Sequence, residues 1–519
     1  MTQAFVVGSG PNGLAAAVTL ALAGCDVTVI EAQSTIGGGA RSTELTLPGL
    51  IHDHCAAIHP LALENPLLQS LTSDDNASLE WLWPAVQCAH PLIQTARGGA
   101  APGSGGAAAA SAGAALYRDV HATAQQFPTA HDRFWWERLF HPLASNFAEL
   151  APDILQPPLR LFRRRARHTD KTVGRRWGNL LRFGVPAGLP AVATSHLWQS
   201  PEARALFAAV AAHGFRPLTG LGSSAIGMML TTAAHARGWP VAKGGSQAIT
   251  DAFVHALQRS GGHVTTGSAI RSLDDLPAGA NDIVMLDTTP QAALNIIGAS
   301  RRPPQVPAHV RAALSRYRYG PGVAVVNFAI DGDIPWTYQP ARRAGTVHLG
   351  GSVRDIHAAE REINRGRLPE RPFVLVTQQY VADPSRSSES LHPIDAYAHV
   401  PAGYTGNRSE QYDASALCAS IERQIEQYAP GFRERIVAKK IRTPADVERD
   451  NANFVGGNIT TGANTLGGLL GRPRLSTNPY TISAHGDGPR VYLCSAATPP
   501  GAGAHGLCGL YAAQAALSR

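Results

Sequence analysis

The residues with the clearest chemistry lie near the start of the chain. Gly-Ser-Gly-Pro-Asn-Gly at residues 8–13 follows a short apolar run, and Glu31 stands eighteen residues beyond the last of these glycines. Gly8 permits a tight turn, Gly10 lets the backbone approach a pyrophosphate, and Gly13 lets a helix pack closely on a strand. The free N–H groups and the positive end of such a helix attract phosphate. Glu31 is then placed to accept hydrogen bonds from an adenosine ribose.

The elements that must position these residues can be predicted around them. Residues 4–7 predict a buried strand, residues 14–23 a packed helix, and residues 26–30 a second strand. Gly24 ends the helix where a left-handed residue costs least. Strand, glycine turn, helix, strand and acid in this order predict a nucleotide-binding βαβ unit. Its expected contacts are Gly8, Gly10, Pro11, Asn12, Gly13 and Glu31.

A second glycine cluster favours FAD over NAD as the nucleotide. Ile-Gly-Gly-Gly-Ala-Arg-Ser at residues 36–42 comes just after the acid, where a plain NAD domain has no such cluster. Closely packed backbone donors and one guanidinium can neutralise a doubly charged diphosphate. Gly37, Gly38 and Arg41 are the expected contacts of a non-covalent FAD. The alternative interpretation of this segment is a flexible surface turn.

Composition limits the other function classes. A chain of 519 residues with ordinary hydrophobic content predicts a large globular core and two or more domains. The formal charge of +7 is modest and predicts no nucleic-acid partner. The six cysteines form no Cys-x-x-Cys pair and the histidines are scattered, which predicts no metal site and a reduced, cytoplasmic setting. The sequence contains no run of eighteen apolar residues, so we expect no membrane-spanning helix.

Two segments have an unusual composition. Residues 97–115 are rich in glycine, alanine and serine and predict a flexible inserted loop. Residues 160–182 are the most basic stretch, with leucine, phenylalanine and tryptophan between the arginines. One interpretation is a solvated basic helix face. The other is an amphipathic patch that docks on anionic lipid, and this makes a peripheral membrane contact a hypothesis.

The order of elements predicts a discontinuous cofactor domain. Residues 239–245 begin a second βαβ-like region, and residues 501–506 form a second glycine turn late in the chain. The expected later strands are residues 263–266, 269–273, 282–286, 322–330, 373–379 and 491–495, and the expected later helices are residues 248–259, 414–428 and 507–517. We expect FAD-binding segments at 1–75, 239–300 and 451–519, and substrate-domain segments at 76–238 and 301–450. No second acid follows the late glycine turn, which argues against an independent NAD(P) domain.

Ten segments spread over almost the whole chain point to one family. They are residues 8–31, 37–42, 53–60, 243–245, 368–372, 383–386, 397–401, 429–432, 455–457 and 492–509. Together they resemble the phytoene desaturase-like family of FAD-dependent oxidoreductases, within the amine oxidase-like flavoproteins. The nearest likeness is the branch called pyridine nucleotide-disulfide oxidoreductase domain-containing protein 2. The sequence departs from the family at residues 98–115 and at Ala496 and Ala497, where many relatives outside this branch carry an acidic flavin contact.

The resemblance implies an α/β fold in two parts. One part is a Rossmann-like FAD-binding domain built from discontinuous segments, and the other is a mixed-sheet α+β substrate domain around an apolar pocket. By position, the resemblance adds Ile270, Gly503, His505 and Gly506 to the expected flavin contacts. The late glycine turn would aim a helix N-terminus at the flavin ring, where it stabilises the charge of the reduced flavin.

The predicted reaction is hydride transfer from a substrate C–H bond to the flavin. The leading hypothesis is dehydrogenation or desaturation of a hydrophobic, polyene- or lipid-like small molecule, with oxygen or a quinone as electron acceptor. The alternatives are amine oxidation, flavin-assisted cis–trans isomerisation, and a non-enzymatic scaffold that FAD stabilises. If a proton leaves the substrate, His59 or His505 is the candidate base, and Tyr397 and His399 are candidate substrate residues. A packing role is the alternative for all four.

Overall fold

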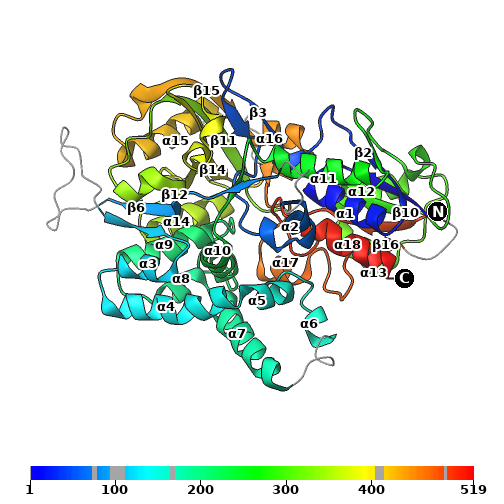
Figure 1. Cartoon of the computed structure of the whole chain (residues 1–519), viewed down its shortest axis with the longest axis horizontal. Helices are drawn as coiled ribbons and strands as arrows, with labels where there is room; N and C mark the ends of the chain where they lie inside the picture. The colour runs from blue at the N-terminus through cyan, green and yellow to red at the C-terminus, as the bar shows by residue number, and fades with distance from the viewer. Residues whose placement is uncertain are drawn as a thin grey trace.

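Two large β-sheets organise the protein, one in each half of the molecule (Figure 1). The computed structural model describes residues 2–72, 79–93, 112–163, 170–403, 414–483 and 488–518. Segments that are distant in sequence alternate between the two halves. The architecture therefore agrees with the predicted two-part α/β fold, while the domain boundaries remain a prediction.

The first sheet has the strand order β16-β17-β10-β1-β2-β9. Its strands are β1 (Gln3–Val7), β2 (Asp26–Ile30), β9 (His263–Thr265), β10 (Ile283–Leu286), β16 (Thr481–Ser483) and β17 (Arg490–Leu493). All neighbouring pairs are parallel except β16 and β17. The strand predicted at residues 269–273 is wrong. Ser272 and Asp275 form a capping box there, and these local hydrogen bonds turn the chain into a short 3₁₀ helix at Leu273–Asp275.

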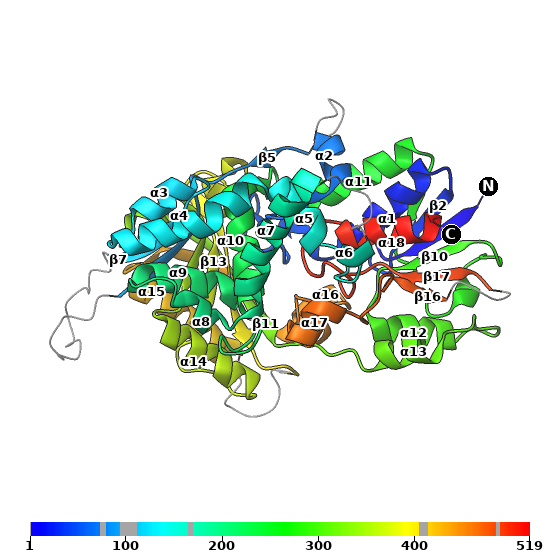
Figure 2. The ribbon, with the colours of Figure 1, turned by 90° about the horizontal axis from the view of Figure 1, so that it is seen from below.

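Helices cover both faces of this sheet (Figure 2). Helices α1 (Pro11–Leu22), α11 (Gln247–Arg259) and α18 (Leu507–Leu517) pack with Ala4 and Val6. Helices α12 (Pro290–Gly298) and α13 (Ala308–Ser315) pack with Phe5 and Val7, because side chains alternate between the faces of a strand. Helix α1 begins at Pro11, three residues before the predicted start, since proline at the first helical position loses no hydrogen bond.

The second sheet is mixed and has the order β15-β11-β14-β13-β12-β6-β7. Its strands are β6 (Val86–Leu92), β7 (Ala112–Leu116), β11 (Gly322–Asp331), β12 (Ala344–Leu349), β13 (Val374–Thr377), β14 (Leu391–Val400) and β15 (Ile436–Arg442). The loop predicted at residues 97–115 is wrong at its end, because residues 112–115 pair with β6 in an antiparallel ladder. Residues 97–111 lie outside the described ranges.

The two faces of the mixed sheet have different partners. Helix α15 (Ala414–Tyr428) packs on the face that carries Val326, Phe328 and Ile330. A helical layer covers the opposite face, as Figure 2 shows. This layer contains α4 (Ala130–Ser145), α5 (Phe147–Ile154), α7 (Asp170–Gly188), α8 (Ala191–Ser195), α9 (Pro201–Ala212) and α10 (Ser224–Arg237). A large cavity lies between this layer and the sheet.

The remaining elements connect the two halves or lie at the periphery. They are α2 (Pro66–Thr72), α3 (Val120–Gln125), α6 (Arg160–Arg163), α14 (Val353–Asn364), α16 (Pro444–Asp450), α17 (Leu466–Gly471), β3 (Ser42–Glu44), β4 (Ile51–Asp53), β5 (Trp81–Leu82) and β8 (Val241–Ala242). Strand β8 pairs with β5 and not with the parallel sheet, so the second βαβ-like region begins later than predicted. Within the described part of the chain, no helix is long and apolar enough to cross a membrane.

Helices α1 and α18 approach each other so closely that glycine is required between them. A Cβ atom added at Gly509 would lie 1.7 Å from the backbone oxygen of Asn12. We expect Gly509→Ala to lower the free energy of unfolding by about 3 kcal/mol, because overpacking forces the two backbones apart. Denaturant titration of the full chain measures this change.

The matched control is Gly178→Ala in α7, where an added Cβ atom meets nothing within 4 Å. Because alanine favours a helix over glycine, this variant should gain about 0.5–1 kcal/mol. Equal stability of Gly509→Ala and the wild type would contradict the close helix contact.

Candidate cofactor and substrate site

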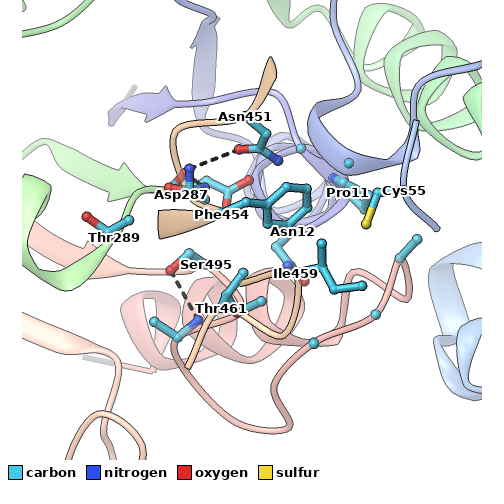
Figure 3. Close-up of a pocket in the computed structure, with 18 of the residues that line it drawn as sticks. Pro11, Asn12, Cys55, Asp287, Thr289, Asn451, Phe454, Ile459, Thr461 and Ser495 are labelled. Carbon is cyan, nitrogen blue, oxygen red and sulfur yellow. Dashed lines mark hydrogen bonds between the residues drawn. The ribbon is translucent and has the colours of Figure 1, made fainter. Parts of the chain in front are cut away.

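The smaller of two connected pockets lies where the parallel strands end and α1 begins (Figure 3). Asp287 after β10, Ser495 after β17 and Asn12 at the start of α1 all line it. The carboxyl ends of parallel strands are where α/β folds bind nucleotides. The pocket therefore lies where the sequence predicts the cofactor.

The two glycine clusters of the sequence come together in this pocket. A Cβ atom at Gly10 would lie 2.8 Å from the carboxylate of Asp287, and one at Gly13 would lie 2.2 Å from the carbonyl oxygen of Gly8. A Cβ atom at Gly38 would lie 3.1 Å from the Cα atom of Gly10. Backbone thus packs on backbone, which brings the N–H groups at the start of α1 to the pocket, where an anion can bind.

Glu31 lies at the end of β2 and is almost completely buried. Its Oε2 atom accepts hydrogen bonds from the backbone N–H of Ser9 at 2.8 Å and from the Ser9 hydroxyl at 2.6 Å. The backbone N–H of Ser268 donates to the Glu31 carbonyl at 2.9 Å. This places the segment of Ile270, a predicted adenine contact, beside the predicted ribose contact.

The Arg41 guanidinium makes hydrogen bonds to backbone carbonyl groups around it. Its Nε atom donates to the carbonyl oxygen of Gly38 at 2.9 Å, and Nη2 donates to the carbonyl oxygen of Asp450 at 2.6 Å. Gly37 has a φ of +114°, a left-handed conformation that suits glycine. Arg41 therefore fixes the shape of the second glycine cluster as well as supplying positive charge to it.

Asp287 is a site residue that the sequence analysis missed. Its Oδ2 atom accepts a hydrogen bond from the backbone N–H of Gly13 at 3.0 Å. Burial raises the pKa of this carboxyl group to about 6, and the nearby Glu31 adds to the increase. The position of Asp287 directly after a buried parallel strand was the signal that could have found it.

The residues of this pocket fit FAD. The carboxylate of Asp287 on the Gly13 N–H shows that the start of α1 attracts an anion. The buried Oδ1 atom of Asn12 has no hydrogen-bond partner among the described residues. The backbone of residues 10–13 would hold the diphosphate, and Glu31 would hold the ribose.

A larger cavity of about 760 Å³ continues from the cofactor pocket. The two share Cys55, Ala56, Ile459 and residues 502–504 in their walls. The other walls include the mixed sheet, helices α7, α10 and α17, the end of α5 and residues 53–62, and most of these side chains are apolar. A cavity of this size and lining suits a hydrophobic small molecule next to the cofactor.

His59 and His505 both line this cavity, and their hydrogen bonds assign them different roles. His59 Nε2 lies 2.9 Å from the hydroxyl of Ser246, which itself donates to the carbonyl of Ala56. His59 Nε2 must therefore carry the proton, and its buried, unpartnered Nδ1 atom is a free acceptor. His505 Nδ1 accepts the N–H of Leu507 at 3.1 Å, which leaves the proton on its unpartnered Nε2 atom. Burial lowers the pKa of both imidazoles to about 4, so both are neutral at pH 7.

The late glycine turn joins this cavity to α1. Gly503 lines both pockets, and Gly506 caps α18 with a φ of +68°. A Cβ atom at Gly506 would lie 2.8 Å from the Cβ atom of Ala15 in α1. The two predicted glycine turns therefore lie side by side.

Tyr397 lines the cavity, but His399 does not. His399 is buried, its Nδ1 atom lies 2.6 Å from Oε1 of Glu360, and its ring stacks on Phe215 at 3.8 Å. Phe215, which lines the cavity, thus covers His399. This geometry fits the packing alternative for His399, and its role as a substrate residue stays a prediction. Burial raises the pKa of the Tyr397 phenol well above its usual range, so the phenol stays protonated.

The charged side chains of the cavity wall already make hydrogen bonds within the protein. Asp395 accepts four hydrogen bonds, from the side chains of His52, Asn327 and Gln379 and from the backbone of Asp53. Asp53 likewise accepts four, from Ser42, Ser246, Gln379 and Arg386. Asp153 pairs with Arg176, and Arg472 donates to Gly468, Asn464 and Ala496. Because a carboxylate has about four acceptor positions, Asp53 and Asp395 have no capacity left.

The basic segment of residues 160–182 contributes to the cavity rather than only to the surface. Trp177, Leu180 and Phe183 of α7 line the cavity, and Arg175 and Arg176 pair with acids of α5. Leu181 also borders the cavity and is 62% exposed. The apolar side of α7 therefore faces inward over most of its described length, and a lipid contact remains a proposal.

Comparison with protein families supports the nucleotide-binding part. Residues 6–73 match the model of the NAD(P)-binding Rossmann-like domain. The chain contains a Rossmann-type nucleotide-binding unit. Among curated proteins, pyridine nucleotide-disulfide oxidoreductase domain-containing protein 2 of Rattus norvegicus is 24% identical over 305 residues, which are 53% of this chain and 50% of the relative. The Mus musculus protein of that name matches equally, so the chain aligns with about half the length of these relatives.

Solved structures show the same overall fold. An oxidoreductase from Methanosarcina mazei has a TM-score of 0.55 at 14% identity, with all of both chains covered. Putrescine oxidase bound to putrescine has a TM-score of 0.57 at 15% identity, covering 100% of this chain and 98% of that one. Cyclohexylamine oxidase from Brevibacterium oxydans has a TM-score of 0.52 at 13% identity, with all of both chains covered. The predicted fold class is confirmed.

The carboxyl group of Asp287 should make cofactor binding depend on pH. It is neutral below its pKa of about 6 and negative above it, next to the expected diphosphate. We expect the Kd of FAD to rise by on the order of tenfold between pH 5.5 and 8, because like charges repel. Fluorescence titration of the apoprotein with FAD measures this Kd.

The matched variant is Asp287→Asn, which keeps the size of the side chain and removes its charge. Its Kd for FAD should stay constant over the same pH range. A wild-type Kd that does not change with pH would contradict the assigned position of Asp287.

Proposed function

We propose that this protein is an FAD-dependent oxidoreductase that dehydrogenates a neutral, hydrophobic small molecule of polyene- or lipid-like character. The observation that carries the proposal is a cofactor pocket that opens into a large, mostly apolar cavity whose charged side chains are all hydrogen-bonded within the described residues. FAD, when bound, supplies the hydride acceptor. The phytoene desaturase-like sequence segments support the same reaction class.

The protein's own residues prepare this reaction. Apolar side chains of α7 and α10 exclude water from the cavity. His59 offers a neutral nitrogen with a free lone pair that can accept a proton from the substrate. His505 offers an N–H donor in the turn before α18, where it can stabilise negative charge.

Amine oxidation is the second candidate. The fold likeness to putrescine oxidase and cyclohexylamine oxidase favours it. An ammonium group needs an acceptor of opposite charge inside an apolar cavity. Asp53 and Asp395 are carboxylates in the cavity wall that could accept hydrogen bonds from an ammonium group. Each of them already accepts four hydrogen bonds from the protein. The cavity wall therefore favours a neutral substrate over a charged amine.

A contact with lipid is also part of the proposal. Leu181, Leu466 and Leu470 border the cavity and are 62%, 38% and 48% exposed. Exposed apolar side chains at the edge of a substrate cavity suit a protein that takes its substrate from a membrane surface. We propose oxygen or a quinone as the electron acceptor.

Anaerobic titration of the FAD-loaded protein tests the proposal. We expect neutral lipid fractions to bleach the absorbance band of oxidised flavin, and air to restore it. Bleaching by amines alone would replace the proposal with amine oxidation. A bound flavin that no compound reduces would favour an isomerase or a scaffold, and a protein that binds no FAD would contradict the central claim.

His59 should limit flavin reduction at acidic pH. Its pKa of about 4 predicts a constant rate of reduction above about pH 5.5 and a fall in rate as the pH drops through 4, because the protonated imidazole cannot accept a proton. His59→Gln should lower the rate on the order of 100-fold. Stopped-flow absorbance measures the rate, and unchanged flavin content of the variant is the control. Equal rates for variant and wild type would remove His59 from the mechanism.

A further inference from the structure

Two polar side chains in the cavity wall take no part in the hydrogen bonds described above. His213 follows α9, and Thr346 lies in β12. Both line the large cavity, and neither lines the cofactor pocket. They belong to the wall that the mixed sheet and its helical layer form.

The hydroxyl group of Thr346 is buried and has no protein partner among the described residues. Thr346 is 3% exposed, and its Oγ1 atom is unpartnered. Thr377 stands opposite it in the register of β12 and β13, and the Thr377 hydroxyl donates to the Asp395 carbonyl at 3.1 Å. Of these two threonines on the cavity wall, Thr346 is the one with a hydroxyl available to a ligand.

The hydrogen bond between two buried histidines determines what His213 presents to the cavity. Nε2 of His213 lies 2.9 Å from Nε2 of His348, and Nδ1 of His348 is buried without a partner. Burial lowers the pKa of His213 to about 3 and that of His348 well below its usual value, so both rings are neutral. One of the two facing nitrogens therefore carries the shared proton.

The location of that proton follows from the environment of His348. If His213 donated, His348 would carry its other proton on Nδ1, as a buried N–H without an acceptor. Buried N–H groups without a partner are rarer than buried acceptors without one. His348 Nε2 is therefore the donor, and His213 carries its own proton on Nδ1. No hydrogen bond from a described residue reaches this Nδ1 atom.

The two available groups both lie next to His348. Thr346 and His348 are two residues apart in β12 and share one face of the strand. The ring of His213 lies 5.0 Å from that of His348, and Trp239 lies 6.0 Å from His213. Leu375 faces His348 across the β12–β13 ladder and also lines the cavity. Thr346 and the ring of His213 thus both lie next to His348. Across the sheet Thr346 is followed by Thr377 and Asp395, whose side chains also line the cavity and are already hydrogen-bonded.

We propose that His213 and Thr346 form a polar subsite that binds an uncharged oxygen acceptor, a carbonyl or hydroxyl oxygen, on the otherwise apolar substrate. This subsite proposal adds detail to the proposed function, and it rests on that function for the reaction that follows binding. The subsite holds the oxygenated part of the substrate and thereby sets which C–H bond lies at the flavin.

The chemistry of the subsite excludes two other ligand classes. An ammonium group would place its N–H donors against the N–H of His213. A carboxylate would be buried beside a neutral imidazole and a neutral hydroxyl, without an opposite charge to compensate it. An uncharged oxygen satisfies both groups without burying a net charge.

Calorimetric titration of the FAD-loaded protein with two matched probes tests the subsite. Tetralin and 1-tetralone have the same ring shape and differ in one carbonyl group. We expect 1-tetralone to bind with a Kd at least about fivefold lower, the effect of one neutral hydrogen bond. Equal affinities would overturn the subsite. They would not decide the proposed function, which flavin reduction tests in a separate measurement.

Three variants test whether His213 and Thr346 cause the preference for 1-tetralone over tetralin. Thr346→Val keeps the shape of the side chain and removes the hydroxyl, and His213→Phe keeps a ring and removes the N–H. Each should lower the 1-tetralone preference severalfold while leaving the Kd of tetralin within about twofold. Thr377→Val is the matched control and should keep the preference, because the Thr377 hydroxyl bonds the backbone.

A preference that survives in both Thr346→Val and His213→Phe would overturn the proposal. So would a lower Kd for 1-aminotetralin than for 1-tetralone in the wild type, because the subsite presents a donor and no charge. The flavin absorbance spectrum of each variant reports whether the fold is intact. Thr346→Val carries the test if His213→Phe does not fold.

Discussion

The close approach of α1 to the backbone around it is the constraint on which the site depends. Gly8 and Gly13 let the start of α1 lie against the end of β10, and Gly509 lets α18 lie against α1. These contacts join segments from the beginning, middle and end of the chain. Because no side chain fits between them, the glycine turns at residues 8–13 and 501–506 hold one fixed geometry around the cofactor pocket.

Electrostatic pairing decides the character of the larger cavity. Asp53, Asp153 and Asp395 lie in its wall, yet each is bound by arginine, histidine or amide donors. Burying an unpaired charge is costly, so paired acids are stable in this position. The rest of the wall is mostly apolar, and its remaining charged side chain, Arg472, is hydrogen-bonded to neutral oxygens. The proposal of a neutral substrate rests on this wall more than on any single sequence motif.

Three histidines show how neighbours assign different chemistry to one residue type. His59 donates to a serine and keeps a free lone pair, His505 accepts a backbone N–H and keeps a free N–H, and His213 accepts from a second histidine and keeps an N–H. All three have lowered pKa values because they are buried. Their protonation therefore stays constant near neutral pH, and the hydrogen bonds alone separate one acceptor from two donors.

The sequence by itself determined the parts that depend on neighbours in the chain. The turn at residues 8–13, strand β2, the acid Glu31 and helix α18 follow from short-range spacing and glycine positions. Only the tertiary structure decided the roles of Asp287, Thr346 and His213, because their partners come from strands and helices far away in sequence. The predictions of a strand at residues 269–273 and of a loop at residues 112–115 were wrong for the same reason. Whether a segment forms a strand depends on a pairing partner that local composition does not reveal.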